Sequence, residues 1–146
     1  MLAIAICEDE LPPVAAWPTG ACVTFEGRVR DEQGRVVALE IEHYPGMTER
    51  EIGRIADQAA ERWPLSMVLV AHRVGRVGVD ELIVRVQVAA RHRREAFEAC
   101  AFIMDYLKTR APFWKKEISA DGVASWVEAK QGDRDAAARW APADEH

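Results

Sequence analysis

Hydrophobic and polar residues alternate along the first third of the chain with the two-residue period of β-strands. Residues 2–6 form a short apolar strand. Residues 21–30 and 35–44 each place apolar side chains on one face and polar side chains on the other. The residues between them, Asp31-Glu32-Gln33-Gly34, are typical of a turn. The pattern predicts that these two strands pair as a β-hairpin.

The next segment, residues 48–63, carries its apolar residues at helical spacing. Thr48 and Glu51 have the spacing of a capping box, and Pro64 marks the end of the segment. We therefore expect a helix whose apolar stripe lies against a sheet.

A second helix is predicted from about Arg93 to Thr109, because Pro112 cannot continue a helical hydrogen-bond ladder. Its apolar residues recur every three or four positions. We expect its buried face to consist of Ala96, Phe97, Cys100, Ile103, Met104 and Leu107.

Four further segments have strand character. Residues 67–75 and 81–90 are joined by a turn that contains Gly and Asp, and residues 113–119 and 125–129 flank a turn at Asp121-Gly122. The last residues form a weak helix followed by a polar tail. The whole order predicts an α+β fold with antiparallel sheet hairpins and two main helices.

The length of 146 residues suits one domain that can bury a sizeable core. We therefore expect a single domain over residues 1–146, with its core at about 20–130.

Basic residues are concentrated in residues 91–116, although the chain as a whole is acidic. The segment holds seven Lys or Arg and three acids, a charge of +4, while the full chain carries −5, so the other 120 residues carry −9. Cations gathered on an otherwise acidic protein focus one anionic ligand. We predict an anion-binding site and no nucleic-acid-binding surface.

Cys7, Cys22 and Cys100 lie far apart and form no CxxC pair, which favours reduced thiols. No apolar run approaches the ~20 residues of a membrane span. The apolar opening segment lacks the basic leader of a signal peptide and is interpreted as a strand. We expect a cytoplasmic protein that does not bind a membrane.

The basic segment offers three kinds of anion contact. Lys108 would lie at the C-terminal end of the second helix, where the helix dipole favours a cation. His92 and Arg93 would lie at its start, where backbone N–H groups attract phosphate. Lys115 and Lys116 would alternate on a strand, so only one of them can face a given pocket.

Arg28 and Arg30 fall on one face of the predicted strand 21–30 and offer guanidinium forks to a phosphate. An ammonium group anchors a carboxylate or phosphate, and a desolvated one among other cations has a lowered pKa and can move protons or attack an acyl carbon. The composition leaves three functions open: an enzyme, a non-catalytic regulatory module that binds a phosphorylated ligand, and an interaction protein that docks an acidic partner.

Several other chemistries lack a signature in the sequence. There is no P-loop, GxGxxG, HExxH or GxSxG motif. The four histidines do not cluster at metal-ligand spacing. His43, His72 and His146 are interpreted as structural or surface residues. We predict no metal and no cofactor.

Five segments carry a resemblance to a known family: ACVTFEGRVR, LEIEHYPGMTE, AHRVG, RHRREAFEACAFIMDYLKTRAPFWKKE and WVEAK. In this order they resemble the large, catalytic subunit of molybdopterin synthase, the MoaE type, over roughly residues 20–140. The long motif FIMDYLKTRAPFWKKE is the most specific part of the match.

The resemblance implies an α/β-hammerhead-type fold and a sulfurtransferase of molybdenum cofactor biosynthesis. Such enzymes convert cyclic pyranopterin monophosphate (precursor Z) to molybdopterin by building its dithiolene. Sulfur arrives on the thiocarboxylated C-terminal Gly-Gly tail of a small ubiquitin-like subunit of the MoaD type. The resemblance also implies a heterotetramer with a central homodimer of large subunits. It therefore favours a pocket that takes Arg93 or Lys130 from the other large subunit.

The same resemblance assigns roles to individual residues. Lys108 and Lys115 match the two functional lysines; Lys108 is expected to assist proton transfer and Lys115 to lie beside the thiocarboxylate. Arg30 and Arg93 are expected to hold the pterin phosphate. The full substrate-binding set that it implies is Phe25, Arg28, Val29, Arg30, His92, Arg93, Lys108, Lys115, Lys116, Glu117 and Lys130.

Two positions depart from the family pattern. Lys130 stands where an arginine is expected, which keeps the charge and removes the bidentate fork. The segment before Gly20 is short compared with the family pattern, so the partner or dimer contacts made there in the family are not expected in this chain.

Overall fold

The computed structural model describes residues 1–127 and 131–141. Within them, strands form two four-stranded sheets. The first sheet has the order β1 (Leu2–Cys7), β4 (Leu65–Arg73), β6 (Leu82–Ala90) and β2 (Ala21–Arg28). The second has the order β5 (Gly75–Gly78), β3 (Val36–His43), β7 (Phe113–Ser119) and β8 (Ala124–Val127). The helices are α1 (Met47–Arg62), α2 (Arg93–Thr109) and α3 (Gln131–Ala138), so the predicted α+β class is confirmed.

Strand pairing corrects one expectation. β2 runs antiparallel to β6, whereas β3 lies in the second sheet between β5 and β7. The predicted hairpin of residues 21–30 with 35–44 is therefore wrong. β6 is buried along almost its whole length and offers β2 a more apolar partner than β3 does. The turn after β2 carries the chain from one sheet to the other.

Two other predicted pairs are confirmed. β4 and β6 pair antiparallel, and β7 and β8 form a hairpin around Asp121-Gly122. Gly122 has a φ of 89°, a left-handed conformation that glycine adopts without strain. The connection between β4 and β6 also adds β5 to the second sheet, and β1 runs parallel to β4.

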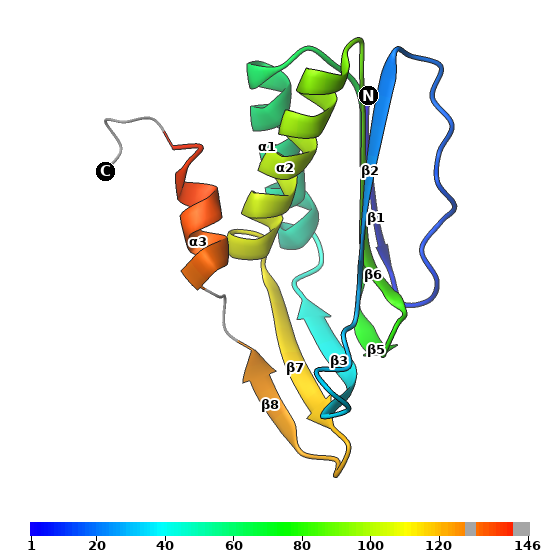
Figure 1. Cartoon of the computed structure of the whole chain (residues 1–146), viewed down its shortest axis with the longest axis vertical. Helices are drawn as coiled ribbons and strands as arrows, with labels where there is room; N and C mark the ends of the chain where they lie inside the picture. Colours follow the sequence, from blue (N-terminus) through cyan, green and yellow to red (C-terminus); the bar gives the residue numbers. More distant parts are fainter. Residues whose placement is uncertain (128–130, 142–146) are drawn as a thin grey trace.

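Both long helices cover one face of the first sheet, and the connection between β1 and β2 runs along its other side (Figure 1). The main core lies between these helices and the sheet. Its fully buried members larger than alanine are Ile52, Ile55, Val70, Val86, Val88 and Ile103. Burying each such side chain stabilises the fold by ~1.5–3 kcal/mol.

The bounds of α2 agree with the prediction, but its buried face is rotated toward α1. Phe97 is 60% exposed, so its predicted burial is wrong. Phe102 is buried instead, and its ring packs edge-on against Trp63 and Trp140. Helical spacing alone does not show on which side a second helix will pack.

The start of α1 also differs from the prediction. The Gly46 N–H donates to Oε2 of Glu49 at 2.5 Å, so this pair, and not Thr48 with Glu51, caps the helix. Thr48 is buried. Its hydroxyl accepts a hydrogen bond from the Tyr44 N–H at 3.1 Å and donates to the carbonyl of Pro112 at 3.3 Å. Thr48 thus ties the start of α1 to the segment that joins α2 to β7.

The second face of the first sheet carries two buried polar residues. The Gln87 side chain pairs with the backbone of Ala15 in both directions, and its Oε1 accepts from the Ala15 N–H at 3.0 Å. Arg85 forms an ion pair with Glu26, with 2.6 Å between Nη2 and Oε2. The bonds of Gln87 to Ala15, with one from Arg85 to the Pro12 carbonyl, hold residues 8–20 against the sheet. All of these contacts satisfy polar groups that burial would otherwise penalise.

A smaller core joins the two sheets. Val29, Ile41, Val77 and Ile83 are buried in it, and Phe113 packs against it from the start of β7. This core fixes the position of β7 relative to β4, and so places the basic residues that follow Phe113.

Candidate anion site

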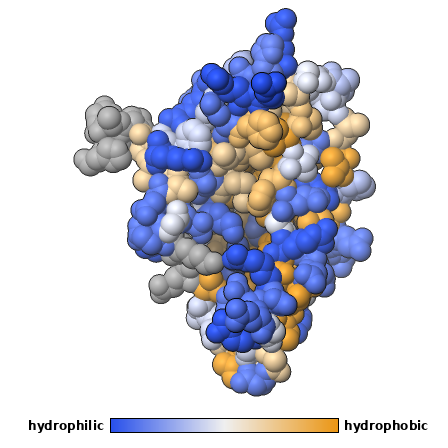
Figure 2. All heavy atoms as spheres, in the orientation of Figure 1, coloured by the Kyte–Doolittle hydropathy of each residue, from blue (hydrophilic) through white to orange (hydrophobic). Residues whose placement is uncertain are grey.

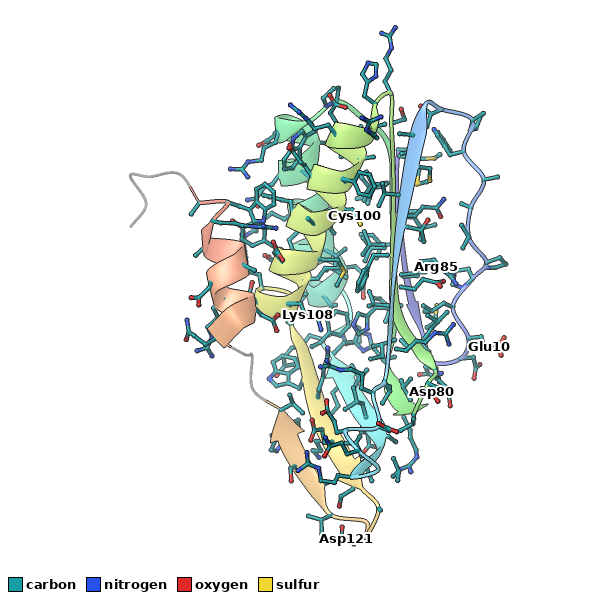
Figure 3. The ribbon with its side chains drawn as sticks, in the orientation of Figure 1. Glu10, Asp80, Arg85, Cys100, Lys108 and Asp121 are labelled. Carbon is teal, nitrogen blue, oxygen red and sulfur yellow. The ribbon has the colours of Figure 1, made fainter. Side chains whose placement is uncertain are left out.

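Lys108 and Lys115 lie close to each other where α2 ends and β7 begins. Lys108 occupies the exposed last turn of α2, and Figure 3 shows it at the lower end of that helix. Lys115 is half-buried on β7, opposite Ile41 of β3 and Val127 of β8. Because Pro112 ends the helix and is bonded to Thr48, the two amines are held by a short, anchored connection.

Burial and, to a smaller extent, the neighbouring positive charge of Lys108 together lower the pKa of Lys115 from 10.5 to about 8. Near neutral pH this amine is charged, yet a fraction of it is neutral and nucleophilic. A desolvated amine beside another cation binds an anion and exchanges protons at physiological pH.

His72 borders the lysine pair, although the sequence indicated a structural role for it. Its ring is only 5% exposed and stacks on Phe113 with ring centroids 3.8 Å apart. Burial and then the charge of Lys115 lower the pKa of His72 to about 3, so the ring is neutral. Its Nδ1 lies 2.7 Å from the carbonyl oxygen of Arg73. A carbonyl only accepts, so Nδ1 carries the proton and Nε2 has a free lone pair.

Asp133 is a second residue that the sequence did not single out. It lies in the first turn of α3, and its negative charge raises the pKa of Lys115 against the larger effect of burial. α3 is fixed to α2 through Trp140, whose Nε1–H donates to Oδ2 of Asp105 at 2.7 Å. The only sequence signal for Asp133 was its place in a weak amphipathic segment.

Alternation on β7 separates the remaining predicted residues. Glu117 shares the face of Lys115 and lies opposite Leu39. Lys116 lies on the other face, where its Nζ sits 4.4 Å from the centroid of the Trp126 ring. The structure therefore brings Lys115 and Glu117 to the same side and directs Lys116 away from them.

The predicted residues around the end of β2 fall into different environments. Arg28 is exposed, and its Nη1–H donates to the Asp80 carbonyl at 2.6 Å. Arg30 is also exposed, with its Nε 3.7 Å from Oε1 of Glu32. Val29 is 2% exposed in the smaller core, and its N–H and C=O bond to Glu81 and Asp80. Only the arginines are free to turn toward a ligand.

Phe25 lies on β2, whereas His92 and Arg93 lie away from the lysine pair. Phe25 is 40% exposed in the middle of β2. His92 precedes α2 and Arg93 begins it, whereas Lys108 lies in its last turn. The rise of a helix places the Cα atoms of Arg93 and Lys108 about 22 Å apart. Within one chain these cations do not share a cavity. Lys130 lies outside the described residues.

The surface near the lysine pair is shallow. A hollow of about 350 Å³ lies between α2 and α3 and is lined by Thr109, Arg110 and Arg134 among others. Another, of about 450 Å³, is lined by Glu8, His43 and Glu49. The acidic lining of the second suits no anion, whereas Arg110 of the first lies two residues after Lys108 in the chain.

Among the residues that the structure describes, no three His, Cys, Asp or Glu side chains are grouped as a metal site would require. Over the same residues no helix combines the length and hydropathy needed to cross a bilayer. What the lysine pair offers is an anchor for a phosphate or carboxylate together with an amine of lowered pKa.

Comparisons with known proteins agree with this chemistry. The sequence profile of the MoaE protein family matches residues 7–110. The molybdopterin synthase catalytic subunit of Mesorhizobium japonicum is 60% identical over 122 residues, covering 83% of this chain and 77% of that protein. The subunit of the same name from Cereibacter sphaeroides is 60% identical over 121 residues, covering 83% and 82%. The solved MoaE protein from Burkholderia ambifaria is 45% identical, with a TM-score of 0.78 and coverage of 96% and 98%.

Proposed function

Because this chain belongs to the MoaE protein family, we propose that it is the catalytic subunit of a molybdopterin synthase. It converts precursor Z to molybdopterin with sulfur from the thiocarboxylated C-terminus of a small ubiquitin-like subunit. The observation that carries this proposal is the lysine pair, since both ligands are anionic and the chemistry transfers an acyl-bound sulfur.

The two lysines suit different steps. Lys115, half-buried and with a pKa of about 8, is placed to anchor the thiocarboxylate and then to release or accept a proton as the carboxylate forms. Lys108, at the exposed end of α2, is placed to hold the substrate and to assist proton transfer as sulfur attacks and the cyclic phosphate opens. The neutral ring of His72 supports Phe113 and adds no further positive charge to the pair.

The phosphate contacts complete the proposed site. Arg28 and Arg30 approach from the end of β2, and His92 and Arg93 come from a second large subunit, because their own chain holds them about 22 Å from Lys108. Phe25, Glu117 and Lys130 belong to the proposed substrate-binding set, whereas Lys116 points to the opposite face of β7 and is left out of it.

The assembly proposed for this chain is a homodimer of large subunits with a small subunit at each end. The Gly-Gly tail of the small subunit enters beside Lys115, which lies opposite Val127 on the edge strand β8. We place the assembly in the cytoplasm; the unpaired thiols of Cys7, Cys22 and Cys100 support that location. We also treat residues 1–146 as one domain, since the bond from Trp140 to Asp105 joins α3 to α2.

The test is a single-turnover reaction of the purified chain with precursor Z and the thiocarboxylated small subunit, followed by detection of the dithiolene pterin. Lys108→Ala should reduce the rate by roughly 30- to 1,000-fold, as expected for the loss of one preorganised cation. Arg54→Ala is a matched control, because Arg54 is exposed on α1 and pairs with Glu51. Near-normal turnover by Lys108→Ala would remove this lysine from the mechanism.

A non-catalytic module that binds a phosphorylated ligand is the second candidate, and the exposure of Arg28, Arg30 and Arg93 favours it to a limited degree. In the same experiment it predicts binding of precursor Z without any dithiolene product.

A further inference from the structure

The connection from α2 to β7 sets how Lys108 and Lys115 lie relative to each other. Lys108 is in the last turn of α2, Lys115 is the third residue of β7, and residues 110–112 join the two elements. Figure 1 shows α1 starting and α2 ending at the same level, directly above β3 and β7. Figure 2 shows polar residues gathered on the surface around this level, below apolar residues that cover the middle of the same face. Whatever fixes the connection from inside therefore fixes the geometry of the lysine pair.

The connection is a tight turn centred on Pro112. The Phe113 N–H donates to the Ala111 carbonyl at 2.8 Å, which closes a three-residue turn. Pro112 has no N–H, so its carbonyl is the one backbone group through which it can form a hydrogen bond. That carbonyl accepts a hydrogen bond from the Thr48 hydroxyl at 3.3 Å. The centre of the turn is thus held by the start of α1.

The Thr48 hydroxyl has a fixed direction. The side chain is 0% exposed. Tyr44 and Thr48 exchange two hydrogen bonds: the Thr48 N–H donates to the Tyr44 carbonyl at 2.9 Å, and the Tyr44 N–H donates to Oγ1 of Thr48 at 3.1 Å. A backbone N–H can only donate, so the hydroxyl proton is left for the Pro112 carbonyl. Because threonine is also stiff at χ1, the position of the hydroxyl is determined by its own turn of α1.

The effect of this bond reaches Lys115 through Phe113. Phe113 follows Pro112 in the chain, pairs with His43 of β3, and stacks on His72 with ring centroids 3.8 Å apart. Lys115 lies two residues further along, on the same face of β7. A shift of the Pro112 carbonyl would therefore move Phe113, and with it the depth at which Lys115 is buried.

Arg110 attaches the same connection to α1 at a second point. Its Nη1–H donates to Oε1 of Gln58 at 3.3 Å, and its Nε lies 3.6 Å from Oε1 of Glu51. The Arg110 side chain is partly exposed, and ion pairs of that kind contribute little. Of the two attachments, the buried bond of Thr48 is the one that holds the turn.

We propose that Thr48 is a positioning residue of the proposed active site: its hydroxyl holds the turn at Pro112 so that Lys115 stays half-buried beside Lys108. Thr48 acts through the turn and does not touch the substrate, because it is fully buried. This inference rests on the proposed function, because it names what arranges the lysine pair for that reaction.

The first test measures the pKa of Lys115 and needs no substrate. Thr48→Val keeps the shape of the side chain and removes both hydrogen bonds of the hydroxyl. Lys115 should then gain water, and its pKa should rise from about 8 toward 10.5. Nuclear magnetic resonance titration of ¹³C-labelled lysine measures the change. The other groups that face Lys115 remain in place in this variant: Lys108, His72, Glu117 and Asp133.

Two matched variants separate positioning from a general loosening of the fold. Thr48→Ser keeps the hydroxyl, so it should return the pKa of Lys115 close to its wild-type value. Ile55→Val trims a fully buried side chain on the same helix without touching the turn, so it should leave that pKa unchanged. Circular dichroism confirms that each variant is folded. If Thr48→Val does not fold, Thr48→Cys takes its place, and its weaker thiol donor should give a smaller rise.

The second test is the single-turnover reaction with precursor Z and the thiocarboxylated small subunit. Thr48→Val should lower the rate by roughly 10- to 100-fold, as expected when a reacting group is misplaced by a change outside the site. Thr48→Ser and Ile55→Val should keep rates close to that of the wild-type protein.

The outcomes separate this inference from the proposed function. An unchanged pKa of Lys115 in Thr48→Val overturns the positioning role even if the rate falls, and so does normal turnover by this variant. An equal rise of the pKa in Ile55→Val, or no recovery in Thr48→Ser, assigns the effect to general loosening and also overturns it. A rise that Thr48→Ser reverses, in a protein that never converts precursor Z, leaves Thr48 as the residue that positions Lys115 and removes the function.

Discussion

The two faces of the second sheet carry similar residues and differ in what surrounds them. Lys115 and Lys116 are adjacent on β7, so their side chains point to opposite faces. Lys115 shares its face with Phe113 and the His72 ring that stacks on it. Lys116 shares its face with Trp114 and Trp126, which are exposed rings at the surface.

The difference shows that burial makes one amine chemically distinct. Lys115 is half-buried on the face of β7 that carries Phe113 and lies near Lys108, and burial and this like charge together lower its pKa to about 8. The ammonium group of Lys116 lies over the exposed indole ring of Trp126. At such an exposed site the cation–π attraction is modest, and the ammonium group stays hydrated. The same side chain thus becomes a reactive group on one face and a surface contact on the other.

Turnover should show the largest contrast between these faces. Lys115→Met should lower the single-turnover rate by roughly 30- to 1,000-fold, since it removes a preorganised cation from a partly dry site. Lys116→Met should change the rate little, because this lysine contacts Trp126 on the outer face and not the lysine pair. Equal losses in the two variants would contradict the assignment of β7 faces.

The dependence of stability on pH should distinguish the faces next. Lys115 has a pKa of about 8 in the folded state and 10.5 when exposed, so between these values the unfolded chain binds more protons. The free energy of unfolding should therefore rise with pH across this window, by ~3 kcal/mol in total from this group. Below pH 8 the penalty for burying the charge is fully present.

Urea denaturation at several pH values measures this effect. Because the Cys100 thiol has a pKa raised to about 11 and contributes in the opposite direction at high pH, the comparison is the wild-type protein against Lys115→Met. The difference between the two should change across pH 8 to 10.5. Parallel profiles would mean that Lys115 titrates normally.

Truncating one ring on each face should give a smaller contrast. Phe113→Ala removes the stack on His72 and contacts with both cores, so it should destabilise the fold by about 2–4 kcal/mol. Trp114→Ala removes a ring that is exposed and touches Tyr44, so about 1 kcal/mol is expected. Thermal unfolding of the two variants provides the measurement. A larger loss from Trp114 would indicate that the outer face is covered.

Several parts of the fold followed directly from the sequence pattern. The bounds of α2 were predictable because Pro112 stops the helix, and the β7–β8 hairpin because Asp121-Gly122 turns the chain. The pairing of β2 was not predictable, because the alternation of apolar and polar residues shows which side chains share a face but not which strand lies alongside. Phe97 was misplaced for a similar reason: the packing of α1 against α2 decides which residues are buried.

The site was predictable as a set of charges and less so as an arrangement. Lys108 and Lys115 come together because only a short connection separates them. His72 and Asp133 reach the same place from β4 and α3, and nothing local in their segments indicates a neighbouring lysine. Arg93 and Lys108 lie on one stripe of one helix, yet helix length keeps them apart within a chain.

The smallest effects concern the charges around Lys115. Lys108→Ala should raise the pKa of Lys115, since Lys108 is a like charge that lowers it, and Asp133→Asn should lower it, since Asp133 favours the charged amine. Nuclear magnetic resonance titration of ¹³C-labelled lysine measures both changes, and the signal missing from Lys115→Met identifies the resonance. The two variants remove charges of opposite sign, so a general loosening of the fold would move the pKa in the same direction in both. Opposite shifts require that Lys115 responds to the individual charges of α2 and α3, which is the condition under which an anionic ligand can in turn change its protonation.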